Sequence, residues 1–126
     1  MRLLLDTHIL LWYCRGTLPP KAEKLVNDRS NQLYFSSANI WEITTKYMLK
    51  KSDFQTNPKQ LHEKLLNDEC IEMPLLAKHM LGIMQLPNIH KDPFDRILLS
   101  QAISENCFLL TADKSLASYP GPIISA

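Results

Sequence analysis

The segment 90–102 places two carboxylates around the start of a predicted helix. Asp92 followed by Pro93 is typical of a helix N-cap with proline at the first helical position, where its missing N–H costs nothing. Counted at helical periodicity from that start, Asp95 shares a face with the apolar residues three, four and seven positions further on. Because burying an unpaired carboxylate costs several kcal/mol, we expect Asp95 to have a cation or hydrogen-bond donors beside it.

Helix capping is the simpler explanation of the same segment. Asp92 at the N-cap and Asp95 three positions later resemble a capping box, and acids in a first helical turn gain about 0.3 to 1 kcal/mol from the helix dipole. Taken alone, the segment favours capping over catalysis. Acids elsewhere in the chain reverse that preference.

Two further aspartates follow predicted buried strands. Asp6 comes directly after the apolar run Arg2–Leu5, and Asp113 follows the run Cys107–Leu110 after two intervening residues. The carboxyl ends of parallel strands meet at one edge of a sheet, where the N-terminus of the Pro93 helix also opens. We therefore expect Asp6, Asp95 and Asp113 to converge there, although Asp113 could simply cap a short helical turn.

Three acids brought together would repel one another and raise one another's pKa values unless a cation neutralised them. Hard divalent cations prefer oxygen ligands, and Mg²⁺ or Mn²⁺ held by carboxylates can support phosphodiester cleavage. Glu42 is a possible fourth acid. Its local pattern alone favours a solvated pair with Lys46, four residues later on the same helix.

The elements that must position these acids alternate along the chain. Strands are predicted at Arg2–Leu5, Leu33–Phe35, Cys70–Met73, Cys107–Leu110 and, as an edge strand, Pro120–Ile124. Helices are predicted at Ile9–Tyr13, Lys21–Arg29, Ala38–Leu49, Pro58–Asp68, Leu75–Met84 and Pro93–Asn106, with a turn at Lys114–Ser118. This alternation indicates an α/β domain with a mostly parallel sheet and right-handed crossovers.

For two of these helices the apolar spacing predicts which side chains are buried. In the helix 38–49, Trp41 and Met48 are predicted to point inward with Ile40 and Ile43, while Glu42 lies on a mixed stripe. In the helix 75–84, methionines at helical spacing are predicted to be core residues rather than part of a cofactor site.

Composition sets further bounds. A length of 126 residues predicts one domain, and 45% hydrophobic with 21% charged residues is ordinary for a globular protein. The net charge of +1 gives no global signal for nucleic acid, so an anionic substrate would have to be held locally. Three widely spaced cysteines fit a reducing cytoplasm. The longest apolar region, 71–89, is broken by charges and prolines, so no membrane span is expected.

Four motifs stand in a fixed order along nearly the whole chain: Leu-Leu-Leu-Asp-Thr-His at 3–8, Trp41-Glu42-Ile43, Asp-Pro-Phe-Asp-Arg at 92–96, and Leu110-Thr-Ala-Asp113. In this combination the chain resembles the PIN-domain ribonucleases and, among them, the VapC-type toxins of bacterial toxin–antitoxin pairs. The resemblance implies a single PIN domain over residues 1–126 and a three-layer α/β/α fold with strand order 3-2-1-4-5. It also implies that Mg²⁺ or Mn²⁺ is held by four acids, Asp6, Glu42, Asp95 and Asp113.

Several polar residues near these acids are candidates for supporting roles. Thr111 resembles the small polar residue that accompanies the fourth acid in the family, and Asp92 is expected to cap the helix and to lie in the outer part of the site. Two cations are candidate partners for phosphate or carboxylate, with solvated surface as the equal alternative, namely Arg96 and Lys46. Two histidines next to site residues are expected to make local hydrogen bonds rather than to catalyse, namely His8 and His90.

The activity implied by the resemblance is metal-dependent hydrolysis of RNA by an endoribonuclease that acts as a toxin. A small antitoxin protein covering the acidic rim and a homodimer are the implied partners. One alternative is a phosphoacceptor signalling domain, against which the first strand ends in a single acid and no lysine follows the last strand. The other is a PIN-fold binding module without catalysis, which the retained acids disfavour.

Overall fold

A parallel sheet forms the centre of the structure, a computed structural model that describes residues 1–88 and 92–126. Within those residues its strands are β1 (Arg2–Leu5), β2 (Gln32–Ser36), β3 (Ile71–Met73), β4 (Phe108–Thr111) and β5 (Ile123–Ser125). They lie in the order β3-β2-β1-β4-β5, and every pairing is parallel. The expected strand order is confirmed, and the sheet is entirely rather than mostly parallel.

The helices follow the predicted order with small shifts at their ends. They are α1 (Thr7–Arg15), α2 (Pro20–Asn27), α3 (Ser37–Met48), α4 (Pro58–Asn67), α5 (Ala77–Leu81), α6 (Pro93–Ser104) and α7 (Lys114–Ala117). A 3₁₀ turn, η1 (Gly82–Gln85), continues α5, so the single helix predicted over 75–84 is in fact two short pieces. The loop predicted before α6 lies partly outside the described residues.

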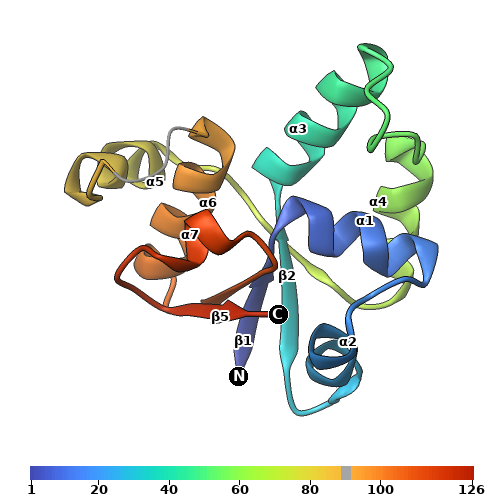
Figure 1. The fold of residues 1–126 in the computed structure, drawn as a ribbon, viewed down its shortest axis with the longest axis horizontal. Coiled ribbons are helices and arrows are strands. Elements are labelled where there is room, and N and C mark those ends of the chain that lie inside the picture. The colour runs from blue at the N-terminus through green and yellow to red at the C-terminus, as the bar shows by residue number, and fades with distance from the viewer. Residues whose placement is uncertain (89–91) are drawn as a thin grey trace.

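The side chains of the central strands alternate between two hydrophobic cores. Leu3 and Leu5 of β1 pack with the helices α1 to α4, whereas Leu4 packs with α6 and α7 on the other face. Figure 1 shows α1 to α4 on one side of the sheet and α5 to α7 on the other. The result is the expected three-layer α/β/α arrangement.

The helices that connect the strands lie on one face of the sheet as far as β3 and on the other face between β3 and β4. Connections from β1 to β2 and from β2 to β3 use α1 to α4, while the return to β4 passes through α5 and α6. Outside the carboxyl ends of β1 and β4 there is therefore a topological switch point, the usual place for a ligand site in such sheets. Asp6 and Asp113 follow these two strand ends.

Two exposed methionines correct the prediction for 75–84. Met80 is 49% and Met84 81% exposed, so the methionine stripe lies on the surface and not in the core. The reason is the shortness of α5 and η1, which rest on α6 through few inward residues.

In the described part of the chain, no helix combines the length and the apolar character needed to cross a membrane.

A polar contact seats α6 against α5. The Ser100 hydroxyl donates to the His79 carbonyl at 2.5 Å, and a Cβ at Gly82 would lie 2.5 Å from that same hydroxyl oxygen, so only glycine fits there. The buried His79 accepts a hydrogen bond at Nδ1 from the Leu76 amide at 2.9 Å. Its Nε2 lies 3.0 Å from a Glu105 carboxylate oxygen.

The carboxylate of Glu105 makes this junction sensitive to acid. Lys78 and His79 lower the pKa of Glu105 to about 2 from 4.5. Because the pKa is lower in the folded state, the stabilisation is present above the unfolded pKa and is lost as pH falls through the folded one. We expect Glu105→Gln to lower the free energy of unfolding at pH 7, with the difference from the parent shrinking between about pH 4.5 and pH 2.

Urea unfolding at a series of pH values measures this effect. Glu63→Gln is the control, because Glu63 is an exposed helical glutamate of α4. A difference between Glu105→Gln and the parent that is equally large at pH 7 and pH 2 would contradict the role given to the carboxylate.

Candidate active site

Asp6 and Thr111 connect the carboxyl ends of β1 and β4. One oxygen of the Asp6 carboxylate accepts the Thr7 amide at 2.7 Å, and the other accepts the Thr111 hydroxyl at 2.7 Å. Asp6 is 4% exposed, and burial is the main cause that raises the pKa of its carboxyl, with the two hydrogen bonds acting in the opposite direction. Asp6 is thus a buried acid whose charge is costly in the chain alone.

Thr7 links Asp6 to the acid on α3. Its hydroxyl donates to Glu42 Oε1 at 2.6 Å, while its own oxygen accepts the Asn39 side-chain amide at 3.0 Å. Asn39 also accepts the Ser36 amide at 2.7 Å, as part of the capping arrangement that begins α3. One asparagine therefore fixes both the start of α3 and the bridge between two acids.

Sequence reasoning did not assign Thr7 or Asn39 to the site. Asn39 stands three residues after the N-cap Ser36, the spacing of a capping box, which was the one signal that marked it. Nothing local to Thr7 indicated that its hydroxyl would meet a glutamate 35 residues further along the chain.

Glu42 lies on the buried face of α3, whereas its local sequence pattern alone indicated a solvated pair with Lys46. It is 3% exposed, whereas Trp41 is 56% and Met48 73% exposed. The pair with Lys46 exists, at 2.6 Å, but on the Glu42 side it is buried rather than solvated. The predicted inner face is right for Ile43, which is fully buried, and wrong for Trp41 and Met48. Glu42 takes a buried position because Thr7 and Lys46 supply the partners that make a buried glutamate tolerable.

The two remaining predicted acids lie at helix starts. Asp113 caps α7 through the Ser115 and Leu116 amides, and its own amide donates to the Thr111 hydroxyl at 3.0 Å. Asp95 is 7% exposed in the first turn of α6, on the same buried face as Leu98 and Leu99, as predicted. Asp92 caps α6 by accepting the Phe94 amide at 2.9 Å, so the capping interpretation also holds for Asp92 and Asp113.

The carboxylates supply a hard, all-oxygen donor set. Asp6, Glu42 and Asp113 are linked through hydrogen bonds of Thr7 and Thr111. Among residues 1–88 and 92–126, no group of three or more acids, histidines or cysteines is already gathered closely enough to hold a metal ion. The chemistry of the donors fits Mg²⁺ or Mn²⁺, because both prefer carboxylate oxygens to thiolates.

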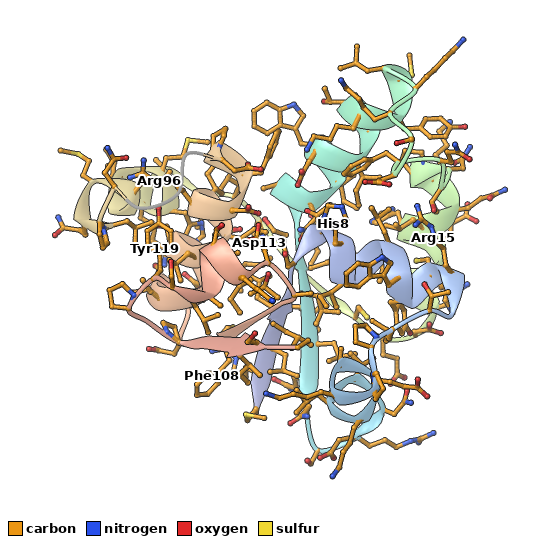
Figure 2. All side chains as sticks on the ribbon, in the orientation of Figure 1. His8, Arg15, Arg96, Phe108, Asp113 and Tyr119 are labelled. Atoms are coloured by element: carbon orange, nitrogen blue, oxygen red, sulfur yellow. The ribbon has the colours of Figure 1, made fainter. Side chains whose placement is uncertain are left out.

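The other predicted supporting residues are spread more widely (Figure 2). His8 lies near Asp113 in that view, and its ring packs against Trp12 and Phe54 at centroid distances of 5.9 and 5.7 Å. Arg96 lies toward α5, away from Asp113, and its buried Nε has no hydrogen-bond partner in the described part of the chain. His90 lies outside the described residues.

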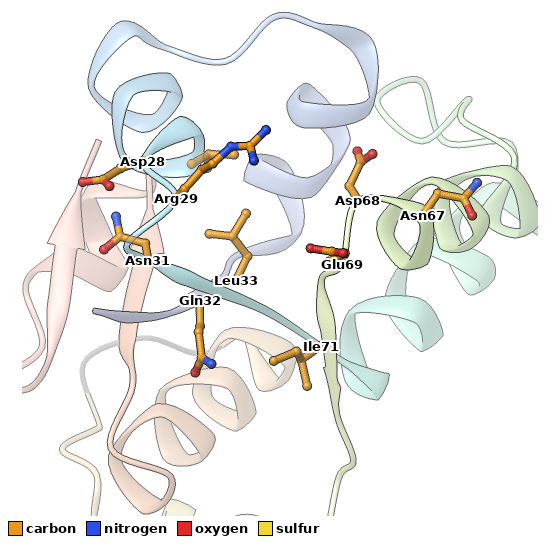
Figure 3. A pocket seen from close by; sticks show the side chains of 10 residues that line it. Asp28, Arg29, Asn31, Gln32, Leu33, Asn67, Asp68, Glu69 and Ile71 are labelled. Atoms are coloured by element: carbon orange, nitrogen blue, oxygen red, sulfur yellow. The ribbon is translucent and has the colours of Figure 1, made fainter.

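A separate hollow of about 760 Å³ lies away from these acids (Figure 3). Its lining comes from the α2–β2 and α4–β3 connections and includes Arg29, Gln32, Asp68 and Glu69. These connections lead into the amino ends of β2 and β3, opposite to the edge where Asp6 and Asp113 lie. The hollow therefore takes no part in the candidate active site.

The fold agrees with the comparison with known families. The sequence matches the family model of the PIN domain over residues 3–122. The chain therefore belongs to the PIN domain family. This membership argues against the phosphoacceptor signalling domain considered from the sequence.

Several solved structures share the fold across almost the whole chain. VapBC2 from Rickettsia felis, bound to a DNA fragment from their promoter, gives a TM-score of 0.73 at 19% identity, covering 99% of this chain and 98% of that chain. DNA-bound VapBC from Salmonella typhimurium gives 0.69 at 15% identity, covering 99% and 98%. A toxin–antitoxin complex from Klebsiella pneumoniae gives 0.67 at 18%, covering 98% and 96%. No curated protein matches the sequence significantly.

Proposed function

We propose that this protein is a metal-dependent endoribonuclease of the VapC type, the toxin of a toxin–antitoxin pair. The observation that carries the proposal is the pair of buried acids, Asp6 and Glu42, which Thr7 joins at the carboxyl edge of a PIN-type sheet. Two buried carboxylates held side by side are expensive for stability alone. Such an arrangement is typical of a site that binds a cation for chemistry.

Mg²⁺ or Mn²⁺ is the proposed cofactor, held by Asp6, Glu42, Asp95 and Asp113. When bound, such an ion offers Lewis acidity toward a phosphate oxygen and an activated water. The protein's own contribution is orientation. Thr111 and the Thr7 amide fix the two oxygens of Asp6, and Lys46 holds one oxygen of Glu42 while Thr7 holds the other.

Two aspartates in one helical turn provide a matched test. In Asp95→Asn the buried carboxylate is lost, and we expect RNA cleavage to fall by at least about 100-fold, because even partners of metal ligands cost 10- to 100-fold. In Asp92→Asn the cap is kept, since asparagine caps as well as aspartate, and the cleavage rate should fall by less than it does in Asp95→Asn. The measurement is cleavage of end-labelled RNA with Mg²⁺, with Mn²⁺ and with a chelator.

The outcomes separate the proposal from its alternative. Equal cleavage by Asp95→Asn and the parent, or cleavage that persists in chelator, contradicts the metal-site assignment. Binding of RNA without cleavage under any divalent ion would instead identify a PIN-fold binding module. Melting curves of both variants show whether a loss of activity reflects unfolding.

We further propose a small antitoxin protein as partner, a homodimer and a cytoplasmic location. The antitoxin is supported by the structural neighbours from Rickettsia felis and Salmonella typhimurium, which are VapBC complexes. Co-purification of the chain with the product of an adjacent short gene, followed by loss of RNA cleavage in the complex, is the expected result. Sedimentation of the isolated chain as a monomer at high concentration would contradict the homodimer.

A further inference from the structure

An aromatic pair joins the two helices that carry Glu42 and Asp95. The Trp41 ring of α3 lies 5.0 Å from the Phe94 ring of α6, centroid to centroid, with the planes inclined by 68°. Trp41 is 56% exposed although tryptophan is highly buried on average, so much of its surface is open to solvent. Each ring is directly adjacent in sequence to a proposed metal-binding acid.

Lys46 connects this aromatic pair to the carboxylates. Its Nζ lies 5.7 Å from the centre of the Phe94 ring and 2.6 Å from a Glu42 oxygen. A second ring, that of Phe54, lies 4.9 Å from the same Nζ. The contacts therefore run without a break from the exposed indole of Trp41 through Phe94 and Lys46 to Glu42.

An exposed aromatic ring beside a cation and the proposed cleavage site is suited to stacking against an unpaired base. Bases without a pairing partner stack on aromatic side chains, and this stacking tolerates any base because each has a π-face. A base inside a duplex has its faces covered by its neighbours and cannot reach a ring in this way. Met48 of the same helix is also exposed but carries no aromatic ring, so it offers no comparable platform.

We propose that Trp41, supported by its inclined contact with Phe94, is a stacking subsite for one unpaired base of the bound RNA. The inference rests on the proposed function, since it assigns a positioning role beside the same site. Stacking at Trp41 fixes the nucleotide next to the carboxylates and thereby orients the RNA backbone for cleavage. The subsite selects unpaired nucleotides by shape and not by sequence.

Binding is measured with the Asp6→Asn protein, so that the RNA stays intact. The probes are a fluorescein-labelled single-stranded RNA 12-mer and a blunt duplex of the same sequence. Adding Trp41→Ala should weaken binding of the single strand by about 5- to 150-fold, the range of base–aromatic stacking. Trp41→Phe should restore most of the affinity, and Met48→Ala, on the same helix, should leave it unchanged.

Removing single bases from the RNA distinguishes stacking on Trp41 from a purely structural role of that residue, because a structural role would not make the affinity depend on one particular base. Removing the base at the stacked position should weaken binding to the Asp6→Asn protein but not to the protein that also carries Trp41→Ala. At every other position an abasic substitution should lower the RNA affinity of the two proteins by the same factor, since independent sites contribute additively.

The results separate this inference from the function on which it rests. Equal affinity with and without Trp41→Ala, while the parent still cuts RNA, overturns the subsite alone. A change in oligomeric state on Trp41→Ala with unchanged RNA affinity also overturns it, because the indole then faces a second copy of the chain. If the parent neither binds nor cuts RNA with any divalent ion, both the subsite and the proposed function are overturned.

Discussion

Asp6→Asn is expected to abolish RNA cleavage while leaving the protein folded. Asp6 is 4% exposed and its hydrogen-bond partners, the Thr7 amide and the Thr111 hydroxyl, are neutral. Asparagine has the same shape without the buried charge, so its desolvation cost is lower. Its single oxygen can still accept the Thr7 amide, but its NH₂ group then faces the Thr111 hydroxyl, which must accept instead of donate. Loss of a carboxylate ligand should lower the cleavage rate by at least about 100-fold, beyond the 10- to 100-fold effect of outer partners.

Thermal melting and RNA cleavage, measured side by side, test this expectation. The parent should melt at a higher temperature when Mn²⁺ is added, because a ligand that binds the folded state stabilises it, and Asp6→Asn should show little of this shift. Asp28→Asn is the matched control, an exposed aspartate at the end of α2. A variant that melts well below the parent would show that Asp6 is held for stability and not for chemistry.

Thr111→Val is expected to damage stability and activity together. Thr111 is fully buried, and its hydroxyl both donates to Asp6 and accepts the Asp113 amide. Valine has nearly the same volume but cannot donate to the buried Asp6 oxygen, and loss of that hydrogen bond costs about 1 to 3 kcal/mol of unfolding free energy. Because Asp6 loses its orientation, the cleavage rate should also fall by about 10- to 100-fold.

Thr111→Ser provides the control, since serine keeps the hydroxyl and loses only a methyl group. Urea unfolding gives the change in free energy, and the cleavage rate at saturating metal gives the change in activity. If Thr111→Val and Thr111→Ser are equally active, the hydroxyl does not position Asp6 for the reaction. If only stability changes, Thr111 supports the fold without a role in the site.

The alternation of elements could be predicted because local signals define each one. Arg2–Leu5 is an apolar run too short for a helix, and Pro93 after Asp92 begins α6 at the predicted residue. The strand order came from the resemblance to the PIN family and agrees with the structure. The ends of α5 could not be predicted, because its apolar spacing suggested a longer buried helix than the chain forms.

The candidate site was predictable for the acids that follow strands and only in part for Glu42. Asp6 and Asp113 follow from the rule that ligand sites lie at the carboxyl ends of parallel strands. For Glu42 the local pattern indicated a surface pair with Lys46, and only the family resemblance indicated the site. The residues that join the acids, Thr7 and Asn39, were missed because their partners are remote in sequence.

The sequence by itself determined the order of strands and helices, which acids stand at strand and helix ends, and hence the class of fold. Only the tertiary structure decided which side of α3 is buried and which polar groups meet. The Thr111 hydroxyl reaches Asp6 across 105 residues of sequence, and that of Thr7 reaches Glu42 across 35. Helix and strand signals act over a few neighbouring residues, whereas the partner that makes a buried charge tolerable is supplied by whichever distant segment packs against it.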